Sequence, residues 1–91
     1  MKALHLTISG HVQAVGFRAF VKRNAKLLGL TGWVKNCDNG NVEVLAQGDE
    51  EMLHRFQKIC SVGPPIAKVD SIGVKHCSPE TCSEFSILRS E

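Results

Sequence analysis

An arginine placed just after a glycine-bracketed loop is the first residue in this sequence that could do chemistry. The loop runs from Gly10 to Gly16, and Arg18 follows it at the start of a helical pattern. The first turn of a helix has backbone N–H groups without intrahelical acceptors, and the helix dipole adds partial positive charge there. A guanidinium beside these groups supplies a fork of further donors. The pattern predicts a phosphate or carboxylate site, although a plain loop with a surface arginine would look the same.

A second polar residue, Asn36, ends an otherwise apolar strand pattern just before a hairpin signal at Asp38–Gly40. A side-chain amide can orient a water molecule because it offers both a donor and an acceptor. Val34 stands two residues earlier, so the two side chains share one face of a strand. Asparagine is also a common turn residue, which leaves a purely structural role open.

The elements that must position these two residues follow from hydrophobic periodicity. Alternating apolar residues predict strands over residues 4–8, 30–36, 41–46 and 84–88, and a less regular one within 66–76 in which Gly73 marks a candidate β-bulge. Apolar residues at helical spacing predict a helix over 17–28. A second helix is expected after Asp49 as N-cap, and Gly63-Pro64-Pro65 ends it.

The order of these elements is βαββαβ with one further strand. The handedness of crossover connections places both helices on the same side of the sheet. We therefore predict an α+β fold, a ferredoxin-like α/β sandwich with two helices on one face of a mainly antiparallel sheet, as a single domain over residues 1–91. The first and second strands run in the same direction, so Asn36 is expected at the same end of the sheet as the loop. The outer face would carry His5, Thr7, Glu43 and Gln47.

Composition narrows the function classes. The charges are 11 basic and 9 acidic residues, a balance that disfavours a general nucleic-acid binder. No apolar run approaches the ~20 residues that cross a bilayer, and the alternating N-terminus does not read as a signal peptide. We expect a cytoplasmic monomer without membrane contact. The four cysteines show no C-x-x-C pair and are expected as reduced thiols.

A longer set of residues resembles the acylphosphatase family. It comprises Gly10-x-Val12-Gln13-x-Val15-x-Phe17-Arg18, then Ala25, Leu28-Gly29-Leu30, Gly32-Trp33-Val34-Lys35-Asn36 and Gly40-x-Val42-Glu43, and closes with Phe85-Ser86-Ile87. The resemblance implies the ferredoxin-like fold and hydrolysis of acyl phosphates to a carboxylate and orthophosphate, without metal or organic cofactor. It also implies that Arg18 binds the phosphate and that Asn36 positions the attacking water. The loop amides from Gln13 through Ala14, Val15, Gly16 and Phe17 to Arg18 would hold the phosphoryl oxygens.

One residue departs from the family pattern. Ala14 stands where the family usually has glycine, inside the phosphate-binding loop. If that position needs a positive φ, alanine costs on the order of 1 kcal/mol there. This departure keeps open a non-catalytic or weakly active ferredoxin-like accessory or binding domain. An RNA-binding module is disfavoured because the outer face of the first and third strands has no aromatic pair.

Overall fold

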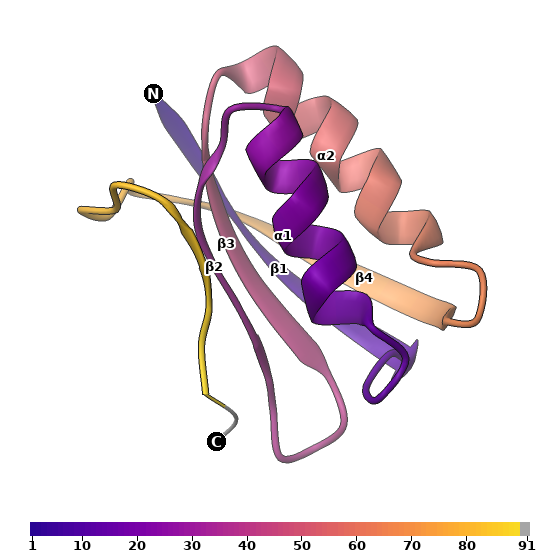
Figure 1. The fold of residues 1–91 in the computed structure, drawn as a ribbon. Helices are drawn as coiled ribbons and strands as arrows, with labels where there is room; N and C mark the ends of the chain where they lie inside the picture. The colour runs from indigo at the N-terminus through magenta and orange to yellow at the C-terminus, as the bar shows by residue number, and fades with distance from the viewer. Residues whose placement is uncertain (90–91) are drawn as a thin grey trace.

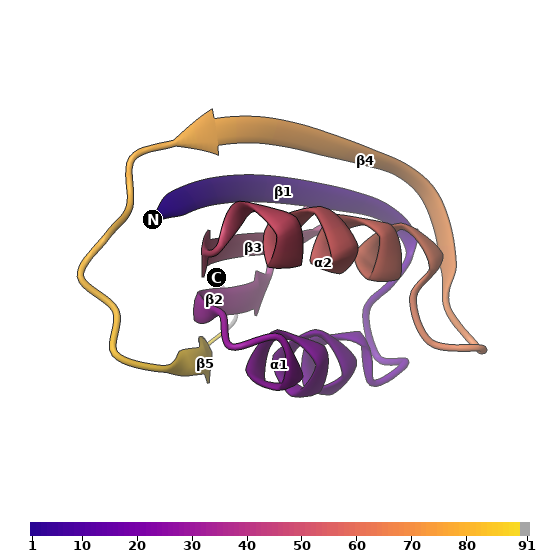
Figure 2. The same cartoon turned by 90° about the horizontal axis from the view of Figure 1, so that it is seen from above.

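A five-stranded sheet with two helices on one face makes up residues 1–89, which the computed structural model describes (Figures 1 and 2). The strands are β1 (Lys2–His11), β2 (Thr31–Asn36), β3 (Val42–Gly48), β4 (Lys68–Cys77) and β5 (Phe85–Ile87), and the helices are α1 (Phe17–Leu27) and α2 (Glu50–Val62). The strand order is β4-β1-β3-β2-β5. Only the β2–β5 pair is parallel among these neighbours. The predicted ferredoxin-like architecture is confirmed.

The helices begin and end where the sequence signals predict. α1 is followed by Gly29 at φ 71°, a left-handed conformation that suits glycine after a helix. α2 starts directly after Asp49 and ends at Gly63, whose φ is 74°. A Cβ built at Gly63 would lie 2.7 Å from the ring of Phe17, so glycine also lets the chain pass close to α1.

The core lies between the helices and the inner face of the sheet. It is formed by residues that alternate along the strands and recur along the helices, among them Leu4, Leu6, Ile8, Phe17, Val21, Val34, Val42, Val44, Phe56 and Phe85, all buried. Phe56 of α2 and Phe85 of β5 meet edge to face with ring centroids 6.2 Å apart. This contact anchors the short last strand against the second helix, although the two are far apart in sequence.

The outer face of the sheet is less exposed than its polar pattern suggests. The connection from β4 to β5 passes on the side away from the helices, as Figure 2 shows. Gln47 is only 1% exposed beneath it. Its Nε2 donates to the carbonyl of Glu80 at 2.7 Å, and its Oε1 accepts from the N–H of Glu80 at 2.8 Å. These two bonds satisfy the buried amide and fix the connection to the sheet.

The β-bulge lies elsewhere than predicted. Gly73 pairs in regular register with Thr7, so the prediction at that glycine is wrong. The register shifts between Ser9 and Gly10, which leaves Asp70 as the extra residue of β4. A Cβ at Gly10 would lie 2.1 Å from the carbonyl oxygen of Lys68. The two backbones approach so closely that only glycine fits at this position of β1. The extra residue of the bulge, Asp70, lies on the neighbouring strand β4.

Candidate active site

The two candidate residues lie at the same end of the sheet: Arg18 is the second residue of α1, which follows β1 after a short loop, and Asn36 is the last residue of β2. β1 and β2 are both antiparallel to β3, so they run in the same direction. One strand separates them, which corresponds to about 10 Å across the sheet. A pocket of about 200 Å³ at this end is lined by Val12, Ala14, Gly16, Phe17, Arg18, Ala19, Asn36 and Ile87. The structure thus brings Arg18 and Asn36 together, as the topology predicts.

The loop before α1 presents unused backbone donors. Gly16, the N-cap, has φ 76°, and no side chain caps the helix. The first helical bond runs from the N–H of Phe20 to the carbonyl of Gly16 at 3.0 Å. No acceptor within residues 1–89 takes a backbone hydrogen bond from the N–H groups of residues 13–19. Such a run of N–H groups at a helix N-terminus suits a bound oxyanion.

Ala14 adopts a backbone conformation that alanine disfavours. Its φ is 60°, and it is the only non-glycine residue with a positive φ among the described residues. The left-handed region costs a residue with a Cβ about 1–2 kcal/mol. Ala14 also lines the pocket, so this strain sits within the loop that would bind the anion. The condition set out from the sequence, a positive φ at this position, is therefore met.

Gln13 and Val15 face away from the pocket. The Nε2 of Gln13 donates to the carbonyls of Cys37 and Asn41, both at 2.8 Å. These bonds tie the loop to the β2–β3 hairpin, so Gln13 acts as a brace. Val15 packs against the core. Both residues belong to the predicted phosphate-binding loop. Because their side chains lie outside the pocket, only their backbone N–H groups can bind a phosphate there.

Asn36 supplies an acceptor that no group of the described residues uses. Its Oδ1 is buried, and no hydrogen-bond donor reaches it within residues 1–89. A buried polar atom left unpaired costs about 1–3 kcal/mol, which makes such atoms uncommon outside functional sites. The atom belongs to a residue that lines the same pocket as Arg18. A small rotation of the Asn36 amide would let a water or hydroxyl donor in the pocket satisfy it.

Among residues 1–89, the lining of the pocket includes one charged side chain, Arg18, and no acid or histidine. No carboxylate of residues 1–89 lies within 4 Å of the Arg18 guanidinium. His11, the other titratable residue of the loop region, is exposed and does not line the pocket. Arg18 and the loop N–H groups therefore dominate the field at this point of the surface.

Cys37, next to Asn36, turns toward the outer face of the sheet. Its Sγ donates to Oε2 of Glu43 at 3.4 Å. Burial, together with this hydrogen bond and the negative charge of Glu43, raises the pKa of the Cys37 thiol above its ordinary value. The thiol stays protonated near neutral pH and offers no nucleophile to the pocket.

The predicted site lacked three lining residues, Val12, Ala19 and Ile87. Ala19 follows Arg18 on α1, and Ile87 reaches the pocket because β5 pairs with β2 at the register Val34–Ile87. Nothing in the sequence places the last strand beside β2, so Ile87 carried no signal. Across residues 1–89, no helix is long and apolar enough to span a membrane. The same residues contain no group of three or more His, Cys, Asp or Glu arranged to hold a metal ion.

Comparisons with known proteins agree with one another. The family model described as Acylphosphatase matches residues 4–87. The chain is 46% identical over 87 residues to the acylphosphatase of Thermotoga maritima, covering 96% of this chain and 97% of that one. It is 41% identical over 90 residues to that of Methylococcus capsulatus, covering 98% of each. A crystal structure of acylphosphatase from Bacillus subtilis matches with a TM-score of 0.94 and 43% identity, over 97% of this chain and 99% of that one.

Proposed function

This chain belongs to the acylphosphatase family, and we propose that Arg18 and Asn36 carry its reaction. The protein is a hydrolase that converts an acyl phosphate and water into a carboxylate and orthophosphate. The comparisons do not favour a non-catalytic accessory domain. The roles of individual residues rest on the geometry of the pocket.

In this proposal the phosphoryl group binds at the N-terminus of α1. The N–H groups of residues 13–19, which have no acceptor within residues 1–89, receive its equatorial oxygens. Arg18 adds two charge-assisted hydrogen bonds from its guanidinium. In phosphoryl transfer the charge is spread over these oxygens, so donors fixed by the fold stabilise the transition state without reorganising.

Asn36 holds the attacking water. The single observation that carries this role is its buried Oδ1, which lacks a donor among the described residues and belongs to a residue that lines the pocket shared with Arg18. The water donates one hydrogen bond to Oδ1, and its oxygen attacks phosphorus in line with the bond to the acyl oxygen. That bond breaks, and its electron pair leaves with the carboxylate. The proton of the water passes to a phosphoryl oxygen. A carboxylate is a good leaving group, so no protein acid is needed.

The experiment compares two variants by hydrolysis of acetyl phosphate and by titration with inorganic phosphate. Arg18→Gln is expected to raise KM, lower kcat and weaken phosphate binding, with a loss of at least about 100-fold in kcat/KM. Asn36→Ala is expected to lower kcat by about 100-fold with the phosphate affinity within twofold of the unmodified protein. Arg55→Gln, an exposed arginine on α2 paired with Glu51, is the control and should behave as the unmodified protein.

Equal losses of phosphate affinity in Arg18→Gln and Asn36→Ala would contradict the separation of roles. Backbone resonances of residues 13–19 identify the binding place, because they should shift with phosphate in the unmodified protein. If these resonances stay fixed while others move, the anion site lies elsewhere.

We further propose that residues 1–91 act as one domain, as a monomer, on a small acyl phosphate rather than on nucleic acid or a membrane. The support is a single sheet that joins all described strands and an outer face on which the β4–β5 connection covers Gln47 of β3. A cytoplasmic, reducing location is supported by four unpaired cysteines, of which Cys60 is buried. Burial raises the pKa of Cys60 to about 12, so this thiol is inert.

A further inference from the structure

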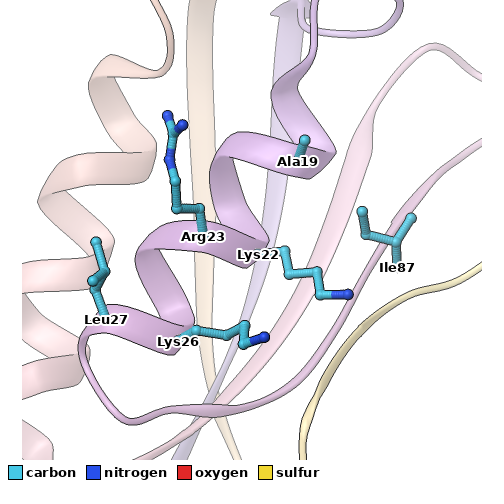
Figure 3. A pocket seen from close by; sticks show the side chains of 6 residues that line it. All are labelled: Ala19, Lys22, Arg23, Lys26, Leu27 and Ile87. Atoms are coloured by element: carbon cyan, nitrogen blue, oxygen red, sulfur yellow. The ribbon is translucent and has the colours of Figure 1, made fainter.

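A second groove opens beside the phosphate pocket along the outer side of α1. It has a volume of about 440 Å³ and is lined by Ala19, Lys22, Arg23, Lys26 and Leu27 of α1 and by Ile87 of β5 (Figure 3). Ala19 and Ile87 also line the phosphate pocket. The two cavities therefore share a wall, and a molecule bound in the first can extend into the second.

The groove is cationic along one row of the helix. Arg18, Lys22 and Lys26 follow one another at intervals of four residues, which places them on one face with about 6 Å of helix axis between neighbours. Figure 3 shows Lys22 and Lys26 extending toward the side on which Ile87 lies. No carboxylate of residues 1–89 lies within 4 Å of either ammonium group.

From this continuity we infer that the groove binds the acyl part of the substrate and that Lys22 selects acyl phosphates with a second anionic group at the far end of the acyl chain. The inference rests on the proposed function of the neighbouring pocket. With the phosphoryl group at the start of α1, the acyl chain leaves the pocket past the small side chain of Ala19. Its carbon atoms lie against Ile87, and a terminal carboxylate or phosphate meets Lys22 one turn beyond Arg18.

Lys22 is better placed for this role than the other two cations of the groove. It is half-buried, whereas Arg23 and Lys26 are exposed. A lysine whose stem is held against apolar surface loses less side-chain entropy when its ammonium group is engaged. Arg23 also points to the side of α1 away from Ile87 (Figure 3).

The groove also has apolar side chains, which could instead favour a neutral acyl chain. Leu27 is 78% and Ile87 is 40% exposed. If these side chains governed recognition, a neutral acyl chain would bind at least as well as one with a charged end. The cationic row favours an anionic end, because a carboxylate or phosphate gains a charge-assisted hydrogen bond from Lys22 that a methyl group does not.

Two non-hydrolysable probes of equal length test the inference. They are the phosphonate analogues of succinyl monophosphate and of butyryl phosphate, in which a methylene group replaces the bridging oxygen. The first ends in a carboxylate and the second in a methyl group. Their dissociation constants are measured by titration of backbone amide resonances for the unmodified protein, Lys22→Gln, Lys22→Arg and the control Lys58→Gln, an exposed lysine of α2.

The unmodified protein should bind the carboxylate probe about fivefold more tightly, the upper end of what one partly exposed ion pair provides. Lys22→Gln should reduce this preference to below twofold, whereas Lys22→Arg and Lys58→Gln should keep it. Equal affinity for the two probes in the unmodified protein, or a preference that survives Lys22→Gln, overturns the inference.

The same titrations also show whether the proposed phosphate site itself is wrong. In that case neither probe shifts the amide resonances of residues 13–19. If both probes shift these resonances with equal affinity, the phosphate site stands and only the role of Lys22 is refuted.

Discussion

At the scale of single residues, Ala14 is where the sequence and the backbone conflict. The loop holds this residue at φ 60°, a conformation that glycine adopts freely and alanine does not. The strained backbone belongs to the same loop whose N–H groups would face the phosphate. Transition-state stabilisation depends on donors aimed within a fraction of an ångström, so strain here affects the rate more than the fold.

We predict that Ala14→Gly raises kcat/KM by up to about tenfold, or ~1.4 kcal/mol of transition-state stabilisation. The glycine relaxes the folded loop but also gives the unfolded chain more freedom, so global stability is a poor reporter. The measurement is hydrolysis of acetyl phosphate by both proteins at equal concentration, after circular dichroism has shown that both are folded. An unchanged or lower kcat/KM would mean that the loop accepts alanine without a catalytic cost.

The sequence predicts that Arg18 and Asn36 lie at one end of the sheet, because the order of elements gives the direction of the strands and side-chain alternation gives the face. It did not identify the partners of Gln13 or Gln47. A glutamine in a loop or on a strand has the same local pattern whether it is solvated or bound to a distant carbonyl. Only the packed chain brings Cys37, Asn41 and Glu80 within reach of these amides.

At the scale of elements, the β2–β3 hairpin and the loop before α1 form one unit. Gln13 joins them through its two hydrogen bonds of 2.8 Å, and Asn36 lies at the end of the same hairpin strand. The brace therefore fixes the loop N–H groups relative to the acceptor that would hold the water. A change in the brace is expected to disturb catalysis without touching substrate.

We predict that Gln13→Ala lowers kcat/KM by about tenfold and destabilises the protein by about 1–3 kcal/mol, because two hydrogen bonds of about 0.5–1.5 kcal/mol each are lost. The carbonyls of Cys37 and Asn41 keep their backbone donors, the N–H groups of Gly40 and Cys37. Gln57→Ala on α2 is the control, since no hydrogen bond of its side chain is found within residues 1–89. Hydrolysis of acetyl phosphate and urea denaturation provide the two readouts. Unchanged activity with reduced stability would limit Gln13 to a structural role.

Most elements were predicted within one or two residues because apolar periodicity and glycine or proline signals mark their bounds. β1 is longer than predicted, since its pairing with β4 extends through Gly10 to His11 beyond the apolar residues. The bulge was assigned to Gly73 because glycine is the usual signal. The extra residue is Asp70, and its cause is the close approach of Gly10 on the neighbouring strand, which only tertiary pairing reveals.

At the scale of the whole molecule, a polar network crosses the outer face from β1 to β2 through β3. Nε2 of His5 lies 3.0 Å from Oε1 of Glu43, and Nζ of Lys35 lies 3.7 Å from its Oε2. Burial acts to raise the pKa of Glu43, but the hydrogen bond from Cys37 and the charges of Lys35 and His5 outweigh it. The pKa is therefore held below its ordinary value of 4.5.

A carboxyl whose pKa is lowered by folding stabilises the folded state above the pKa it has when unfolded. This contribution is lost as the pH falls from about 4.5 through the folded-state pKa. We predict that Glu43→Gln costs about 0.5–1 kcal/mol at pH 7, the size expected of a partly exposed ion pair. The difference between the two proteins should shrink below pH 4.5.

Urea denaturation at a series of pH values from 3 to 7 measures this difference. Glu51→Gln serves as control, because its pair with Arg55 is exposed on α2 and should change stability at pH 7 by no more than a few tenths of a kcal/mol. A Glu43→Gln difference that stays constant from pH 7 to pH 3 would show that the carboxylate charge does not contribute.

β4 is an edge strand, and the bulge at Asp70 interrupts the row of N–H and C=O groups that it turns outward. Lys68, Asp70 and Lys75 are exposed along the same strand. A flat, apolar edge is a template on which another chain can add a strand, whereas a bulge and charged side chains oppose that addition. The irregularity that accommodates Gly10 thus also protects the open side of the sheet from intermolecular β-pairing and from seeding aggregates.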